Sequence, residues 1–415
     1  MRIDRNNGRF FLLQVLFWAA YCVLFGYTVT IFGAYGYSAQ ACGIVTTLQY
    51  IVLLVAQPVY GYLMDNLVSP KWFFVGLMVL GGLGALGLPW AFTQPMPILM
   101  GYFLVLSFFI FCAPAVAETW CISVINYTPG MDYGLVRSGG SISYAVTGLI
   151  TGNIIAPLGI RSLFGIHVAV ALLAAALAVT LPDPVKLREH SSLTLEKPPR
   201  VSFGKAIGFL LKNKPFVIYT LCMTCYNFAS RATQVYMPII LAGAGGGDAH
   251  YGLSLFIASG GEMLVMLWVS RLVVRGVRME RLFGTALAIF VVRFFLLAAV
   301  NNLWVILAGQ VLLSVGFGLQ VRVHTQYLSQ ITPEGYQGTA ILLCASVASG
   351  LGAMLGNYCG GEMIEQMGTQ PYLYLCAAVL LVGFLLFLPT VLSVRRQEKE
   401  EAARFLLRQL EEERP

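Results

Sequence analysis

The chain has 415 residues, of which 58% are hydrophobic and only 11% are charged, and its mean hydropathy is +0.76. A soluble protein needs a polar surface. This composition therefore excludes a soluble protein and indicates that lipid surrounds most of the chain. The net charge of +7 is not carried by a basic, aromatic-rich soluble module, which argues against nucleic acid as a partner.

The apolar residues occur in blocks of about twenty, the length that crosses a hydrocarbon core of ~30 Å. In residues 1–181 we expect six spans: Phe10–Phe32, Gly43–Met64, Trp72–Phe92, Ile98–Val124, Ser138–Leu158 and Leu163–Leu181. In residues 214–392 we expect six more: Phe216–Leu241, Gly252–Val274, Leu282–Val300, Leu303–Tyr327, Thr339–Cys359 and Tyr372–Leu392. The sequence therefore predicts an all-α membrane protein with twelve transmembrane helices in two six-helix halves.

The two expected halves are joined by residues 182–213, where charge density rises and four prolines prevent a continuous helix. We interpret this segment as a cytoplasmic linker. Residues 393–415 form a tail with two possible interpretations, a short amphipathic helix at the membrane surface or a solvated segment.

Basic residues indicate the orientation. Of the 26 Lys and Arg residues, Arg161 alone falls in an expected outer loop, and Arg137, Arg231, Arg293 and Arg322 lie in or at the ends of spans. The others lie at the termini or on the side of the expected linker, so the positive-inside rule predicts that both termini are cytoplasmic. The first span is long and has no small-residue cleavage site, so we expect a retained helix in the plasma (cytoplasmic) membrane, the inner membrane of the cell.

Few charged side chains enter the spans, and each costs ~2.5–3.5 kcal/mol at the bilayer centre unless it is paired, hydrated or functional. The candidates among them are Glu118, Arg137, Arg231, Glu262, Arg293 and Arg322, with His324 near them. Span five places Arg137, Ser141 and Tyr144 on one helical face, because they are separated by four and then three residues. Span seven carries a second polar stripe: Asn227, Ser230, Arg231 and Gln234, with Tyr226 beside them. Both stripes must face a cavity or another helix.

These residues carry a resemblance to the lactose permease group of major-facilitator transporters. Ala113-Pro-Ala-Val116 followed by Glu118, and Asp132-Tyr-Gly with Arg137 and Gly140, resemble spans four and five of the lactose permease. The Asp-Tyr-Gly-x-Val-Arg pattern is more similar still to the phenylpropionate permeases. Gly261-Glu262 and Val292-Arg293 extend the likeness into the second half.

The resemblance implies substrate contacts for four residues. Those matching Glu118 and Arg137 bind sugar hydroxyls, the one matching Tyr144 stacks on the sugar, and the one matching Glu262 also contacts it. With the two stripes, the predicted substrate site is Glu118, Arg137, Ser141, Tyr144, Tyr226, Asn227, Arg231 and Glu262. The alternative is that Glu118 and Arg137 only form an ion pair.

The resemblance does not by itself imply proton coupling. The His and Glu of span ten that are implicated in proton coupling in the lactose permease correspond here to Leu313 and Gly316. Glu262 is the first candidate proton carrier, with Arg293 as its switchable counter-charge. Glu118 and His324 are further candidates. The alternatives are a permanently ionised Glu262 and a solvated surface His324.

Two weaker motifs concern conformation and direction. Gly61-Tyr-Leu-Met-Asp65, followed by Lys71, is similar to the facilitator loop motif, which makes Asp65 a candidate conformational latch, with helix-end solvation as the alternative. Gly140, Gly148 and Gly152 resemble the antiporter motif, but Asn153 replaces its proline. This departure disfavours efflux.

The sequence therefore predicts a secondary active transporter that works by alternating access as a functional monomer in the lipid bilayer. We expect a proton-coupled symporter that imports a small polar organic solute, either sugar-like or an organic or aromatic carboxylate. An efflux antiporter is the first alternative, and a transport-dead solute sensor is the second. We expect no enzyme activity, no cofactor and no metal site, because the corresponding motifs are missing from the sequence.

Overall fold

The computed structural model describes residues 5–189, 203–333 and 336–412. Within these ranges every regular element is a helix, and there is no strand. The helices before residue 190 are α1 (Arg5–Tyr21), α2 (Thr28–Ala34), α3 (Ala39–Asn66), α4 (Pro70–Gly84), α5 (Leu88–Ala91), α6 (Met96–Phe109), α7 (Ala113–Ile125), α8 (Tyr133–Leu158), α9 (Ser162–Val179) and α10 (Pro184–Glu189). A π-helical segment, Cys22–Gly26, separates α1 from α2.

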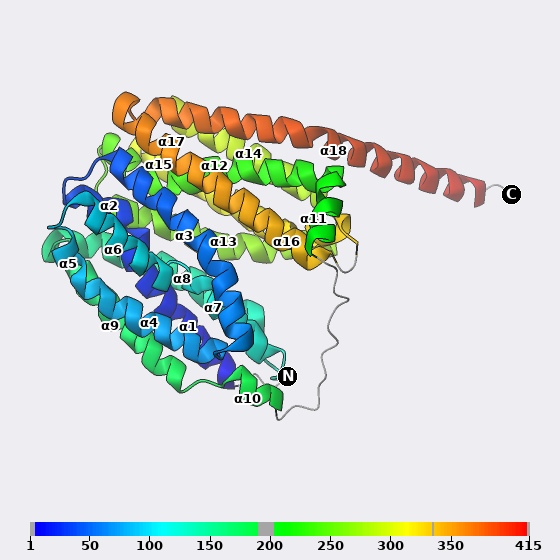
Figure 1. The fold of residues 1–415 in the computed structure, drawn as a ribbon. Coiled ribbons are helices and arrows are strands. Elements are labelled where there is room, and N and C mark those ends of the chain that lie inside the picture. The colour runs from blue at the N-terminus through cyan, green and yellow to red at the C-terminus, as the bar shows by residue number, and fades with distance from the viewer. Residues whose placement is uncertain (1–4, 190–202, 334–335, 413–415) are drawn as a thin grey trace.

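The helices after residue 202 form a second group (Figure 1). They are α11 (Phe203–Lys212), α12 (Lys214–Gly243), α13 (Asp248–Val274), α14 (Met279–Ala299), α15 (Leu303–Ile331), α16 (Gln337–Cys344), α17 (Gly352–Met367) and α18 (Thr369–Glu412). A π-helical segment, Ala345–Leu351, joins α16 to α17.

Eleven stretches of the described residues are long and apolar enough to cross a membrane. They match the expected spans except the seventh. That place is taken by α12, a 30-residue helix that carries the polar stripe with Arg231. The predicted all-α architecture with membrane-spanning helices is confirmed for the described residues.

Local sequence signals set the helices that carry the polar stripes. Asp132 precedes α8, and its side chain accepts a 2.9 Å hydrogen bond from the Leu135 N–H, which satisfies one free donor of the first turn. Asn213 caps α12 in the same way at Phe216, and Pro215 stands in the first turn, where its missing N–H costs nothing. The two caps fix where Arg137 and Arg231 lie along their helices.

The described ends of the linker, the start of α1 and the extension of α18 lie on one side of the bundle. Figure 1 shows the start of α1, α10, α11 and the C-terminal extension of α18 at the same end. The expected linker begins with α10 and ends with α11, while residues 190–202 lie outside the described residues. The expected tail continues α18 as a helix as far as Glu412 and points away from the bundle (Figure 1).

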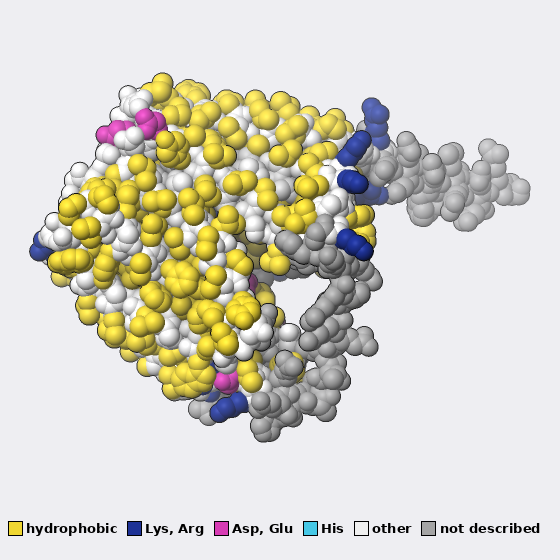
Figure 2. All heavy atoms as spheres, viewed as in Figure 1, with side chains coloured by type: hydrophobic (Ala, Val, Ile, Leu, Met, Phe, Trp, Pro, Cys, Tyr) yellow, Lys and Arg dark blue, Asp and Glu magenta, His cyan; other side chains and the backbone are white. Residues whose placement is uncertain are grey.

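The surface of the bundle is apolar. Figure 2 shows hydrophobic side chains over most of the visible face, with Lys and Arg gathered at the end where α11 and the extension of α18 lie. Large exposed side chains such as Leu80, Val105, Trp304 and Leu342 are between 56% and 69% exposed. A surface of this kind suits contact with lipid acyl chains.

The two groups of helices meet at the end of the bundle opposite α10 and α11. There α8 packs on α13 and α3 packs on α17. The approach is close at Gly152, where a Cβ would lie 2.3 Å from the Asp248 carbonyl oxygen. Polar bonds add to it, since the Ala39 N–H donates to the Glu365 carboxylate over 2.9 Å. At the other end the molecule is hollowed between the groups (Figure 2).

Substituting Gly152 with valine should therefore shift the protein towards a state in which the two groups of helices separate at the end opposite α10 and α11. The added side chain must push α8 from α13, and overpacking costs ~1–3 kcal/mol, about a five- to hundredfold change in an equilibrium. The spin-label distance between cysteines at Thr93 and Asn301, in the two groups, should become longer. Gly165→Val is the matched control, because a Cβ there has no atom within 4 Å. An unchanged distance in Gly152→Val would contradict the prediction.

Candidate substrate site

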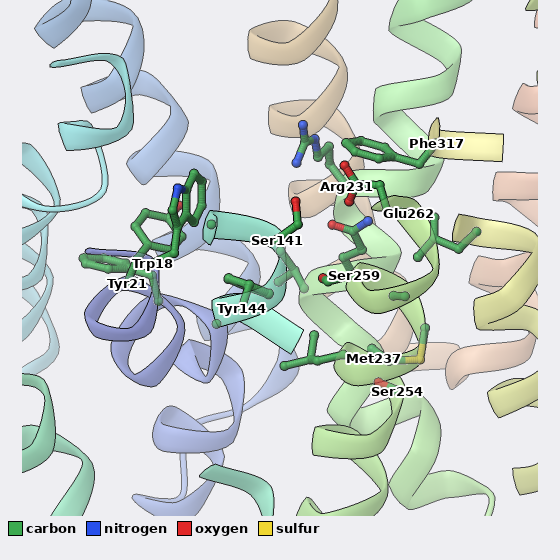
Figure 3. A pocket seen from close by; sticks show the side chains of 18 of the residues that line it. Trp18, Tyr21, Ser141, Tyr144, Arg231, Met237, Ser254, Ser259, Glu262 and Phe317 are labelled. Carbon is green, nitrogen blue, oxygen red and sulfur yellow. The ribbon is translucent and has the colours of Figure 1, made fainter. Parts of the chain in front are cut away.

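A cavity of about 330 Å³ lies between the two groups of helices (Figure 3). Its walls come from α1, the Cys22–Gly26 segment, α3, the turn between α6 and α7, and α8 on one side, and from α12, α13 and α15 on the other. Its lining residues include Trp18, Tyr21, Phe25, Tyr50, Phe111, Arg137, Ser141, Tyr144, Arg231, Gln234, Met237, Tyr251, Ser254, Ser259, Glu262, Gln310, Leu313 and Phe317. The volume is in the range of small-molecule sites.

One wall is aromatic. The guanidinium carbon of Arg137 lies 5.2 Å from the centre of the Trp18 ring, a cation–π contact that fixes its position. Trp18 also meets Tyr144 edge to face, with ring centres 6.2 Å apart. Gly140 makes room for the indole, because a Cβ there would lie 2.5 Å from Trp18 Cδ1. The predicted stripe of Arg137, Ser141 and Tyr144 does line the cavity.

The opposite wall is more polar. All six lining residues of α13 follow the spacing i, i+3, i+4, i+7, i+8 and i+11 of one helical face: Tyr251, Ser254, Leu255, Ala258, Ser259 and Glu262. On α12, Arg231 and Gln234 lie one turn apart and both line the cavity. Figure 3 shows Arg231, Glu262 and Ser259 on this side, facing Ser141 and Tyr144.

Charge in the cavity is unbalanced. Arg137, Arg231 and Glu262 are its charged lining residues, so the formal sum is one positive charge. Within the described parts of the chain, neither arginine forms an ion pair with Glu262 within 4.0 Å. All three groups are therefore available to a ligand, and the field favours an anionic one.

Glu118 lies outside the cavity, although we expected it beside Arg137. It is exposed on α7 and accepts a hydrogen bond from the Tyr133 hydroxyl. Span four is broken at Ile110–Cys112, and α7 continues from the break towards the end of the bundle where α10 lies. Sequence spacing within α7 could not show this displacement.

Tyr226 and Asn227 are also placed away from the cavity. The Tyr226 ring packs on Phe290 of α14, with centres 4.6 Å apart. The Asn227 amide donates to the Met223 carbonyl over 2.8 Å, and its Cβ would be 3.0 Å from a side chain at Gly352. Both side chains are used in packing α12 inside its own group. Tyr226 lies on a face that meets α14, and Asn227, one turn before Arg231 on the same face, lies where α12 packs against α17.

The candidate coupling residues are dispersed. Arg293 is fully buried, donates from Nε to the Gly309 carbonyl over 3.0 Å and lies over the Phe294 ring, so it does not reach Glu262 in this state. His324 Nδ1 is 3.1 Å from the Tyr219 hydroxyl, inside the second group. The Asp65 side chain lies outside the described residues. Of the four coupling candidates, Glu262 is the one that faces the cavity.

Several lining residues were not singled out from sequence. Trp18, Tyr21 and Phe25 in the first span form most of the aromatic wall. Their spacing of three and four residues is a signal that could have been used, but in an apolar span it equally describes packing. Gln310 and Ser254 carry no charge and gave no signal of comparable strength.

Residues 9–376 match the profile described as the MFS_1 like family. The chain belongs to this family. It is therefore an integral membrane secondary transporter of the major-facilitator type and not an enzyme.

Two curated relatives cover most of this transporter. The maltose permease of Geobacillus stearothermophilus is 25% identical over 351 residues, which are 85% of this chain and 86% of that protein. The uncharacterized transporter YwbF of Bacillus subtilis (strain 168) is 24% identical, over 84% of this chain and 82% of its own. Among solved structures, the nucleoside transporter NupG has a TM-score of 0.76 at 15% identity, covering 93% and 99% of the two chains.

A bacterial homolog of the human lysosomal transporter Spinster, solved in an inward-facing and occupied conformation, has a TM-score of 0.67 at 12% identity. It covers 92% of this transporter and 95% of its own chain. At these identities the two structural likenesses show the fold alone. Together with the family they confirm the predicted transporter class.

Proposed function

We propose that this transporter is a proton-coupled symporter that imports a small organic carboxylate, and that it belongs with the lactose and phenylpropionate permeases. The observation that carries the substrate class is the cavity itself, where two arginines and one glutamate share about 330 Å³ with an aromatic wall. An anion with an apolar or aromatic body satisfies both features. Its carboxylate would lie near Arg137 or Arg231, and its body would pack on Trp18 and Tyr21.

A neutral sugar is the second candidate substrate. The maltose permease is 25% identical over most of the chain, and the aromatic wall with Ser141, Gln234 and Gln310 offers stacking and hydrogen bonds. Against it stands Glu118, which the resemblance assigns to sugar hydroxyls together with Arg137 but which is not among the residues that line the cavity. A carboxylate requires no second acid there.

The substrate class is tested by thermal stabilisation of the purified transporter with 3-phenylpropionate, benzoate, maltose and lactose. A ligand at a hundred times its Kd adds ~2.7 kcal/mol to the stability of the folded state, which is readily measured. We expect a carboxylate to stabilise and the sugars to have no effect. If only a sugar stabilises the protein, the proposed substrate class is wrong and the substrate is a sugar.

Glu262 is our choice for the proton carrier, because a carboxyl group in the cavity can contact both substrate and water. Arg231 lines the same cavity as Glu262 and is our choice for its counter-charge, whereas Arg293 is buried outside the cavity lining and would need a rearrangement to reach it. Arg293, His324, Glu118 and Asp65 remain candidates in the roles predicted from sequence. Import is the proposed direction of transport, and an efflux antiporter is the alternative.

We further propose that the end with α10 and α11 faces the cytoplasm in the plasma membrane, and that the monomer is the functional unit. Lys and Arg gather at that end (Figure 2), as the positive-inside rule requires. The described state would then be open to the cytoplasm.

Impermeant thiol labelling tests this orientation. In sealed right-side-out cells, a cysteine at Ser192 should remain unlabelled and one at Asn301, which is exposed at the opposite end, should react. The seven buried and two half-buried native cysteines serve as the background. The reverse pattern would invert the orientation.

A further inference from the structure

A π-helical segment interrupts the first span beside the cavity. The helix α1 ends at Tyr21, and Cys22–Gly26 forms one π turn before α2 begins. Tyr21, Phe25 and Gly26 line the cavity. Single π turns of this kind recur at functional sites, because they change the direction in which the following side chains point.

His167 of α9 is directed at the start of this segment. It is fully buried, and its Nδ1 lies 2.8 Å from the Ala20 carbonyl oxygen. A carbonyl oxygen only accepts, so Nδ1 must carry the proton and donate. Nε2 then holds a lone pair, and it has no partner among the described residues.

In a regular α-helix the carbonyl of Ala20 would accept the N–H of Leu24, which here lies inside the π turn. Where backbone bonding changes from i→i+4 to i→i+5, a carbonyl at the boundary can lack its usual N–H partner, and a side-chain donor can then satisfy that carbonyl. We infer that His167 is a positioning residue, whose Nδ1–H holds the Cys22–Gly26 turn and so sets the shape of the substrate cavity.

The turn connects both walls of the cavity. The Tyr251 hydroxyl of α13 donates to the Gly26 carbonyl over 2.5 Å. A Cβ at Gly26 would lie 2.9 Å from the Tyr144 hydroxyl, and Cys22 Sγ is 3.7 Å from the Tyr144 carbonyl. A change in the turn is therefore transmitted to α8 and α13. This role concerns the geometry of the cavity and does not depend on which substrate it takes.

Two substitutions separate this role from simple core packing. In His167→Asn the amide Nδ2 takes the place of Nδ1 and can still donate, whereas His167→Leu fills a similar volume without a donor. We expect amide hydrogen exchange in residues 20–28 to rise about tenfold or more in His167→Leu, and to stay within about threefold of wild type in His167→Asn. Equal exchange in the two variants, or no change in either, would overturn the inference.

Ser143→Ala is the matched control, because Ser143 Oγ also donates to α1, at the Val15 carbonyl over 2.6 Å. That site lies before the π turn, so exchange in residues 20–28 should not change. A second measurement needs no variant. In protein labelled with ¹⁵N-histidine, His167 should show a proton on Nδ1, and a neutral ring protonated only on Nε2 would overturn the inference even if His167→Leu failed to fold.

Discussion

Replacing Arg137 with lysine should weaken binding of a carboxylate substrate about tenfold to a hundredfold while the protein still folds and inserts. The guanidinium carbon lies 5.2 Å from the Trp18 ring centre, and this cation–π contact holds the guanidinium in place in the cavity wall. A lysine keeps the charge but loses the fork that holds two oxygens at once, and charge-assisted hydrogen bonds are worth ~1.5–3 kcal/mol. Binding is measured by calorimetry or by thermal stabilisation with the carboxylate found in the ligand panel.

The matched control for this substitution is Arg161→Lys. Arg161 is exposed just before α9, away from the cavity, so affinity should not change there. Unchanged affinity in a correctly folded Arg137→Lys protein would show that Arg137 has a structural role and that Arg231 is the main contact for the carboxylate.

Removing the charge of Glu262 should abolish pH-driven accumulation without abolishing exchange. If this carboxyl carries the proton, it must bind the proton in one state and release it in the other, and glutamine cannot do so. In proteoliposomes with an acidic exterior, wild-type protein should concentrate substrate inside. Glu262→Gln should only equilibrate it to a ratio of about one, while counterflow of preloaded substrate continues.

The pH dependence has a definite sign in this scheme. Influx should increase as the external pH falls, because protonation precedes inward movement of the loaded carrier. In Glu262→Gln this dependence should be lost.

Glu118→Gln is the matched control for Glu262, because Glu118 is exposed and lies outside the cavity. It should retain accumulation. Retained accumulation in Glu262→Gln, with loss in Glu118→Gln, would move the proton site to α7. Absence of any pH dependence in wild type would replace proton coupling by sodium coupling or facilitated diffusion.

The sequence alone determined the parts of this protein that depend on local periodicity. Blocks of about twenty apolar residues define the spans, and the spacing of Arg137, Ser141 and Tyr144 places them on one face whatever surrounds the helix. Glu262 was found because an acid inside an apolar span is costly and rare. These signals are carried by a single helix, so one sequence was enough.

Tertiary structure decided which faces meet the cavity. Glu118 lies on α7, beyond the break in span four, and is not among the residues that line the cavity. Asn227 lies one turn from Arg231 but at the depth where α12 packs against α17, while Arg231 faces the cavity. Trp18, in an apolar first span, becomes part of the site only because Gly140 of α8 leaves room for its ring. Periodicity states which residues share a face, but the depth, rotation and neighbours of that face arise from packing between helices distant in sequence.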